Sequence, residues 1–219
     1  MIAKDLISQS VAPLHTSDTA IYALSLMEEY RVSHLPIVNN EDFLGLISED
    51  DLYDYADPEA PIGAHRLSLN KPFVQAHQHI YEVIKLAGEQ RLTLIPVLDS
   101  HNKYLGVIRL DDLAHSFARL TAVDQPGGII TLEMNIHDYS ASEIAQIIES
   151  NDAKILSMYF APVPDTTKIE VTVKINRMDM APIIQTFNRY NYVITASIFE
   201  DENDELQDRY DSLMRYLNV

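Results

Sequence analysis

The chain has 219 residues, 47% of them hydrophobic and 22% charged, a composition typical of a soluble globular protein. Thirty-three acidic residues against sixteen basic ones give a formal net charge of -17, and so negative a surface repels nucleic acid and anionic membrane surfaces. The absence of cysteine excludes disulfides, thiolate metal sites and cysteine nucleophiles.

The N-terminal residues do not read as a signal peptide, because Asp5 stands where the apolar core of such a peptide would begin. No stretch approaches the roughly 20 apolar residues that a membrane-spanning helix needs. We therefore expect a cytoplasmic protein that binds neither membranes nor nucleic acid.

An internal repeat occupies the first half of the chain. Residues 23–38 align without gaps on residues 83–98. After one inserted residue in a polar loop, the alignment continues for residues 43–47 with 104–108 and residues 50–52 with 111–113. A repeat of this kind predicts two copies of one supersecondary unit.

Each copy predicts a helix, a hairpin and a second helix. In each copy, four residues at helical spacing share one face of the first helix. They are Ala20, Leu24, Met27 and Arg31 in the first copy and Ile80, Ile84, Ala87 and Arg91 in the second. Polar turns at residues 39–42 and 99–102 connect two apolar strands. In the later copy we expect Leu113, Phe117 and Leu120 to form the buried face of the second helix. A copy of about 60 residues buries little core alone, so we expect the two copies to pack sheet against sheet.

The order of these features resembles the cystathionine-beta-synthase (CBS) domain, which normally occurs in pairs. The resemblance is carried by a proline turn, Pro36 or Pro96, and by the pattern Gly-apolar-apolar-Ser-x-x-Asp, found in full from Gly45 to Asp51. It implies an α+β fold with a pseudo-twofold pair of repeats, residues 1–60 and residues 61–122.

In CBS pairs, adenosine-containing ligands lie in clefts between the repeats. The resemblance implies that Ser48 and Asp51 hold the ribose, whose two hydroxyls a carboxylate can bind, while the following helix attracts a phosphate. It implies further ligand-binding residues, which are Leu14, His15, Thr16, Ser33, His34 and Pro36 in the first copy and Thr93, Leu94, Pro96, Arg109 and Asp112 in the second. The alternative is that Ser48 and Asp51 only cap that helix.

The second copy departs from the pattern, because Arg109 stands where the family has Ser or Thr. Either this cleft is empty, with Arg109 paired to a neighbouring carboxylate, or Arg109 meets a ligand phosphate; the first is favoured. The nearby cations are few, namely Arg66, Lys71, Arg91 and Arg109. Among AMP, ADP, ATP and S-adenosylmethionine, we therefore expect AMP or S-adenosylmethionine to fit better than ATP, with no obligatory cofactor.

A different domain follows a Pro-Gly-Gly linker at residues 123–128. In residues 129–200 the apolar pattern predicts the order strand, helix, strand, strand, helix, strand, a ferredoxin-like βαββαβ unit. The expected inward side chains are Ile130, Leu132, Met134, Ile136, Ile144, Ile147, Ile148, Ile169, Val171, Val173, Ile175, Ile183, Ile184 and Phe187. In residues 201–219 an acidic run leads into a helix expected to pack on the body or on a partner subunit.

This second half is similar to the ACT domain, a regulatory module that usually binds amino acids at subunit interfaces. Asp138 matches an Asp of that family, but Tyr139 and Ser140 stand where a glycine is expected, so a purely dimerising role is an equal alternative. The whole architecture also resembles the acetoin-utilisation accessory proteins of bacteria.

Motifs of catalysis are missing: there is no nucleophile elbow, phosphate-cradling glycine loop or His-Glu-x-x-His helix, and the pair His77 and His79 has no third ligand in sequence. We expect a non-catalytic regulatory protein, a homodimer that senses an adenosine-containing ligand and acts on an unknown protein target. The alternatives are a dimeric adaptor with empty clefts and an amino-acid sensor working through the ACT-like domain.

Overall fold

The computed structural model describes residues 1–8, 10–65 and 69–199. The chain divides into two compact units, and the boundary between Ser116 and Phe117 falls inside helix α4 (Leu110–Leu120). In the described ranges no helix is both long and apolar enough to cross a bilayer. The predicted acidic run and C-terminal helix of residues 201–219 lie outside the described residues, as does Arg66.

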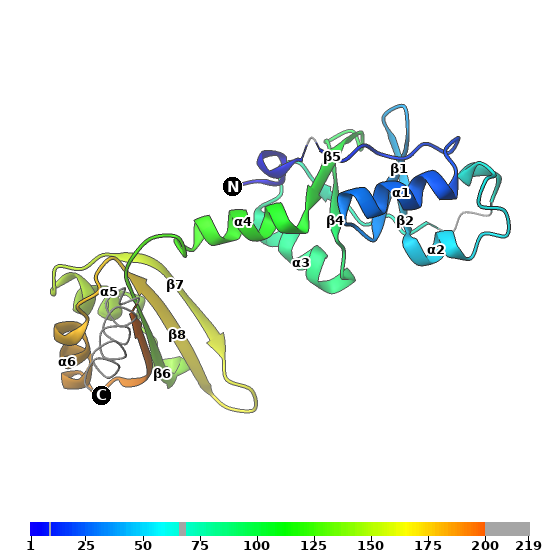
Figure 1. Cartoon of the computed structure of the whole chain (residues 1–219). Helices are drawn as coiled ribbons and strands as arrows, with labels where there is room; N and C mark the ends of the chain where they lie inside the picture. Colours follow the sequence, from blue (N-terminus) through cyan, green and yellow to red (C-terminus); the bar gives the residue numbers. More distant parts are fainter. Residues whose placement is uncertain (9, 66–68, 200–219) are drawn as a thin grey trace, which may run out of the picture. The chain divides into compact units, whose positions relative to one another are not determined.

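The first unit contains both copies of the repeat, each built as the predicted helix, hairpin and helix (Figure 1). The first copy consists of η1 (Ala3–Leu6), α1 (Ala20–Tyr30), β1 (His34–Asn39), β2 (Asp42–Ser48) and α2 (Glu49–Tyr53). The second consists of η2 (Ile62–Ala64), β3 (Val74–Gln75), α3 (Ile80–Gln90), β4 (Leu94–Leu98), β5 (Tyr104–Arg109) and α4.

The first helices of the two copies begin and end at equivalent residues. Thr19 and His79 are the N-caps of α1 and α3, and each side chain accepts a hydrogen bond from the backbone N–H of the helix's first turn. Arg31 and Arg91 end the helices in the left-handed conformation, with φ of 54° and 52°. The prediction that these arginines continue the helical stripe was wrong, because both stand past the last helical turn and are exposed.

The two hairpins share a second feature, a glycine with positive φ opposite a bulge. Gly45 has a φ of 148° and Gly106 of 149°. A Cβ at Gly45 would lie 2.5 Å from Leu69 Cβ, and one at Gly106 would lie 2.5 Å from Ile7 Cγ2. Glycine is therefore needed at both positions for the conformation and for the close approach of another segment.

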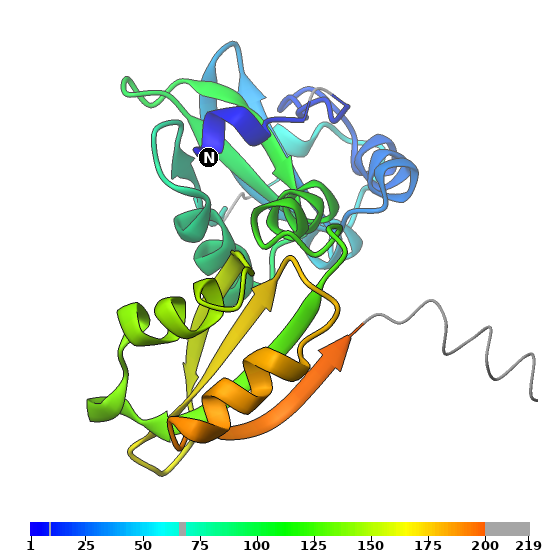
Figure 2. The ribbon, with the colours of Figure 1, turned by 90° about the vertical axis from the view of Figure 1, so that its left-hand side faces the viewer.

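Those approaching segments are exchanged between the copies. The N–H of Ser8, near the start of the first copy, donates to the carbonyl of Val107 in β5 of the second copy at 2.8 Å. The N–H of Leu46 in β2 donates to the carbonyl of Asn70, near the start of the second copy, at 2.9 Å. Figure 2 shows the dark-blue N-terminal segment beside the green strands of the second copy. Each copy thus extends the hydrogen bonding of the other.

The core of the first unit lies between the two hairpins and their helices. β1 and β4 lie against each other, and Leu35, Ile37, Ile95 and Ile108 are fully buried. The predicted buried face of α4 was wrong in part: Leu113 is buried, but Phe117 and Leu120 are each 43% exposed. Only the Leu113 turn of α4 packs into this core.

The second unit is a four-stranded antiparallel sheet with two helices packed on one face (Figure 2). Its elements are β6 (Gly128–Asn135), η3 (Ile136–Asp138), α5 (Ala141–Glu149), β7 (Ile155–Pro162), β8 (Lys168–Ile175), α6 (Ala181–Arg189) and β9 (Val193–Phe199). The sheet order is β7-β8-β6-β9. The predicted order of elements is confirmed.

The core of the second unit forms between the sheet and its two helices. Alternate residues of β6 and β8, such as Leu132 and Val171, pack against Ile147 of α5 and Phe187 of α6. Ile136 was wrongly predicted to point inward and is 50% exposed. β6 ends at Asn135, whose side-chain Oδ1 accepts a hydrogen bond from His137 N–H and starts η3.

Candidate functional site

A cleft with a volume of about 290 Å³ opens beside the start of α2 in the first unit. Both copies contribute to it, because the segment ahead of β3 and the end of α3, both in the second copy, form its second wall. Its lining residues are His34, Leu46, Ser48, Asp50, Asp51, Asn70, Pro72, Gln90 and Leu92. Three of the residues predicted to bind a ligand, His34, Ser48 and Asp51, therefore lie together.

Ser48 and Asp51 form a complete capping box at the start of α2. Asp51 Oδ2 accepts hydrogen bonds from Ser48 Oγ at 2.6 Å and from Ser48 N–H at 3.0 Å, while Asp51 N–H donates to Ser48 Oγ at 3.1 Å. The local sequence dictates this arrangement, which satisfies the first free N–H groups of the helix. Asp51 Oδ1 accepts no hydrogen bond from the described residues.

The expected attraction of a phosphate to α2 is opposed by the helix itself. α2 has only five residues, and its first turn carries the carboxylates of Glu49, Asp50 and Asp51. Like charges at this end offset the favourable helix dipole. The cleft is therefore suited to a hydroxyl-bearing ligand of low negative charge.

His34 is the one half-buried titratable group of the cleft among the described residues. Its Nδ1 lies 3.2 Å from Ser33 Oγ and 3.5 Å from Thr93 Oγ1. Burial lowers the pKa of His34 below its ordinary value of 6.5, and the nearby carboxylates of Asp51 and Asp50 oppose that shift. The imidazole is therefore neutral at pH 7, and the described lining includes no Lys or Arg.

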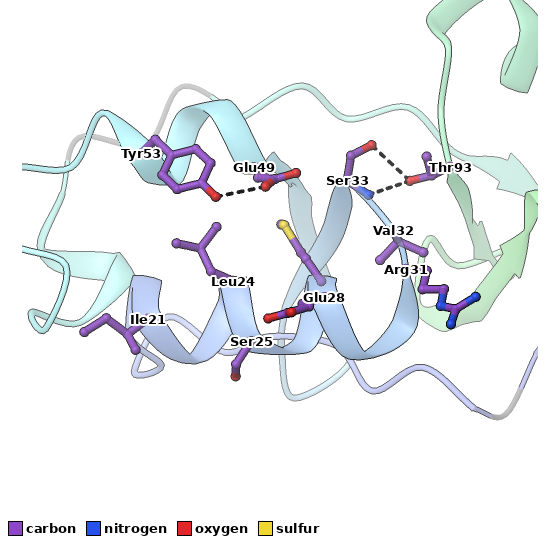
Figure 3. Close-up of a pocket in the computed structure, with 11 residues that line it drawn as sticks. Ile21, Leu24, Ser25, Glu28, Arg31, Val32, Ser33, Glu49, Tyr53 and Thr93 are labelled. Carbon is purple, nitrogen blue, oxygen red and sulfur yellow. Dashed lines mark hydrogen bonds between the residues drawn. The ribbon is translucent and has the colours of Figure 1, made fainter.

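Ser33 and Thr93 line a different hollow, a groove of about 760 Å³ between α1 and α2 (Figure 3). Its walls include Ile21 and Leu24 of α1, and Tyr53 lies across from them with its hydroxyl donating to Glu49 Oε1 at 3.0 Å. The structure thus separates the predicted pocket residues into a cleft and a groove that meet at His34 and its two hydroxyl neighbours.

The remaining predicted residues of the first copy lie outside the cleft. Leu14 and Pro36 are buried in the core, where Leu14 N–H donates to Pro36 O at 2.8 Å. His15 faces Asp18, and Thr16 is hydrogen-bonded to Asn39. In β4, Leu94 and Pro96, which align with His34 and Pro36, are buried as well.

In the second copy Arg109 is paired with a neighbouring carboxylate. Its Nε and Nη2 donate to the two oxygens of Asp111 at 2.9 and 2.6 Å. This bond lowers the pKa of Asp111. Asp112, the counterpart of Asp51, is exposed. The favoured sequence interpretation, an Arg109 side chain engaged by its own neighbourhood, agrees with this geometry.

Sequence reasoning missed six lining residues: Leu46, Asp50, Asn70, Pro72, Gln90 and Leu92. Two of them carry a signal, because Asp50 adjoins Asp51 and Leu46 lies inside the glycine motif. Asn70 and Pro72 reach the cleft only through the exchange of segments between the copies, which an alignment of the copies does not reveal.

A second cavity, of about 370 Å³, lies in the second unit where β6 leads into α5 and α6 leads into β9. It is lined by Glu133, Met134, Asn135, Asp138, Glu143, Lys168, Tyr190, Asn191, Tyr192 and Val193. Asp138 is thus placed in a cavity, whereas Tyr139 packs on Phe160 with ring centroids 5.5 Å apart and Ser140 caps α5. Across the described ranges no three His, Cys, Asp or Glu side chains are grouped to hold a metal ion.

The family model for the CBS domain matches residues 3–57 and residues 67–119. Among curated proteins, the inosine-5'-monophosphate dehydrogenase of Methanocaldococcus jannaschii is 29% identical over 114 residues, which are 51% of this chain and 22% of the dehydrogenase. That of Bacillus subtilis is 28% identical over 102 residues, which are 45% and 21%. The chain thus spans about a fifth of the length of these relatives.

Solved structures with similar parts include a CBS domain pair/ACT domain protein from Thermotoga maritima. It is 22% identical, with a TM-score of 0.49, over 54% of this chain and 98% of its own. The structure of CBSX2 in complex with AMP is 19% identical, with a TM-score of 0.45, over 54% of this chain and 96% of its own.

Proposed function

The chain contains a tandem pair of CBS domains, residues 3–57 and 67–119, and on this premise we propose that it is a non-catalytic, cytoplasmic regulatory protein. Its ligand is an adenosine-containing molecule of low negative charge, held in the cleft at Asp51. No cofactor is obligatory. The observation that carries the proposal is the cleft that joins Ser48, Asp51 and His34 between the two repeats.

Asp51 supplies the ribose contact. Its Oδ2 is engaged by Ser48, whereas Oδ1 is left to accept a hydrogen bond from a ribose hydroxyl. A neutral His34 beside it offers a ring face and one nitrogen to the ligand.

The charge of the lining decides among the nucleotides. Asp50 and Asp51 face no Lys or Arg within the described lining, so each added phosphate weakens binding. AMP should therefore bind more tightly than ADP or ATP, and the cationic S-adenosylmethionine should also be able to bind.

Calorimetric titration of the full chain with AMP, ATP and S-adenosylmethionine tests the proposal. Asp51→Asn keeps one oxygen that can accept from Ser48 N–H, but it replaces the other carboxylate oxygen by an NH2 group and removes the charge. It should therefore weaken AMP binding at least about tenfold while the chain stays folded. Asp112→Asn is the matched control in the second copy and should leave AMP binding unchanged. ATP binding more tightly than AMP would contradict the charge argument.

The capping box and the Arg109–Asp111 pair favour one alternative, a dimeric adaptor whose clefts stay empty. Both interactions satisfy the chain's own polar groups without any ligand. Under this alternative no adenosine compound raises the melting temperature, and Asp51→Ala lowers stability by about 1 kcal/mol through loss of the cap. Under the sensing proposal, ligand at about 100 times its Kd adds roughly 2.7 kcal/mol of stability.

The contact between the two chains of the proposed homodimer is the groove of Figure 3. The dimer would pass the adenosine signal to a protein target. Ile21 at its edge is 50% exposed and Tyr53 is 67% exposed, and a second copy would cover both. Ile21→Asp should therefore shift the chain to monomers in analytical ultracentrifugation. Leu110→Asp is the matched control, because Leu110 is 47% exposed in the first unit but does not line the groove. A monomeric parent chain would end this part of the proposal.

The second unit fits a ferredoxin-like, ACT-like domain, which makes amino-acid sensing the other alternative. Its support is the order of elements and the position of Asp138 in the 370 Å³ cavity. The filled turn at Tyr139 and Ser140 favours the dimerising role instead. A thermal-shift series with the common amino acids decides between them.

A further inference from the structure

The cavity in the second unit carries an excess of negative charge. Three carboxylates, Glu133 of β6, Asp138 of η3 and Glu143 of α5, meet there from different elements. Lys168 is the one cation in the described lining, and it is already paired with Glu133 at 2.6 Å. The carboxylates of Asp138 and Glu143 therefore remain without a positive partner in the described part of the chain.

Tyr192 holds one of these carboxylates in place. Its hydroxyl donates to Glu143 Oε2 at 2.9 Å, and the pair lies at the base of α5. Burial, together with this hydrogen bond, raises the pKa of Tyr192 to about 12, so the phenol stays a neutral donor. The other oxygen of Glu143, Oε1, accepts no hydrogen bond from any described residue.

The rest of the cavity lining consists of apolar and aromatic side chains and two amides, Asn135 and Asn191. Met134 and Val193 line it beside the rings of Tyr190 and Tyr192. Such a surface accepts a short methylene chain, and the phenol rings attract an ammonium group. A ligand that carries its own carboxylate or phosphate would meet no unpaired cation in the described lining, and its charge would be repelled.

From this combination we propose that the cavity binds a small organic amine through its ammonium group, with the ammonium between Asp138 and Glu143 and the methylene chain against Met134 and Tyr192. The site lies within the second unit and does not rest on the proposed nucleotide cleft. It differs from an amino-acid site because it rejects the carboxylate of an amino acid.

The experiment is calorimetric titration of the full chain with 1,4-diaminobutane and with 4-aminobutanoate, which have chains of equal length but differ in one terminal group. The diamine should bind with saturation, and 4-aminobutanoate should bind at least about tenfold more weakly. Tighter binding of 4-aminobutanoate would overturn the proposal, as would a diamine that produces no saturable heat.

Two variants separate this site from general attraction to an acidic chain. Glu143→Gln still accepts the Tyr192 hydrogen bond but lacks the charge, so it should weaken the diamine at least about tenfold. Glu149→Gln removes one charge from the same helix outside the cavity and should leave the affinity unchanged. Equal losses in both variants would overturn the proposal. AMP titrated into Glu143→Gln reports on the first unit separately, so the two proposals can fail independently.

Discussion

Thr93 Oγ1 accepts a hydrogen bond from the backbone N–H of Ser33 at 3.1 Å, and the two residues are 60 positions apart, at equivalent places in the two copies. The pseudo-twofold axis therefore passes close to this contact. Beyond it, the carbonyls of Ser33 and Thr93 accept the N–H groups of Glu49 and Leu110, where α2 and α4 begin. The contact between Ser33 and Thr93 therefore links both hairpins to the starts of α2 and α4.

Loss of this contact should destabilise the first unit. Thr93→Val keeps the shape of the side chain but leaves the part-buried N–H of Ser33 without a partner, so we expect the free energy of unfolding to fall by about 1–3 kcal/mol in urea denaturation. Ser33→Ala retains the N–H···Oγ1 bond and should cost less. Equal stabilities of Thr93→Val and the parent would show that water replaces the threonine.

Alanine at two glycines of the first unit should change stability in opposite directions. Gly45→Ala combines a positive φ with a Cβ 2.8 Å from the carbonyl oxygen of Asn70, and we expect a loss of more than about 2 kcal/mol. Gly88→Ala is the control, because it lies within α3 with no atom inside 4 Å of the new Cβ. It should raise stability by about 0.5–1 kcal/mol. Thermal melting of both variants measures the contrast.

Stability should depend on the protonation of His34. Because burial lowers its pKa in the folded chain below 6.5, the unfolded chain binds more protons, and the free energy of unfolding must rise with pH through the range just below 6.5. This stability is present above pH 6.5 and is lost on acidification. His34→Asn should remove that part of the slope. The difference between the urea midpoints of parent and variant, followed from acid to neutral pH, isolates His34; a difference that does not vary with pH would contradict the assignment.

Restoring the motif in the second copy should create a second ligand site. Arg109→Ser replaces the cation by the hydroxyl found at Ser48 and frees Asp111 from its bidentate bond. If the proposed function holds, the stoichiometry of AMP in calorimetry should rise from one to two. Arg109→Lys, which keeps the cation, is the control and should leave it at one. An unchanged stoichiometry in Arg109→Ser would show that the hydroxyl is not what the second cleft lacks.

The sequence predicted the repeat well because both copies keep the same local signals. Gly45 and Gly106 need their backbone conformation, and Thr19 and His79 cap equivalent helices, so propensity and structure agree. The alternating residues of β8 were placed correctly for the same reason, since period 2 specifies the face of a strand.

The wrong or missing predictions have another cause. An apolar pattern shows which face of a helix or strand is apolar, but it does not show which residues of the chain pack on that face. Phe117 and Leu120 continue the apolar stripe of α4 but are exposed. The walls formed by Asn70 and Pro72, and the hydrogen bond from Tyr192 to Glu143, arise from residues distant in sequence. The motifs therefore identified three of the nine residues that line the candidate cleft, and four of the others, in the second copy, reach it only through the packing of the two copies.

Because the segments at Ser8 and Asn70 are exchanged, neither repeat should fold without the other. A fragment cut after residue 60 would leave β2 with an unsatisfied edge and would uncover Leu35 and Ile37, which the other repeat shields, so it should precipitate and not fold alone. Because each half supplies a strand partner to the other, two such fragments produced together should recombine into one soluble body, and a natural gene carrying a single copy would have to form that body from two chains.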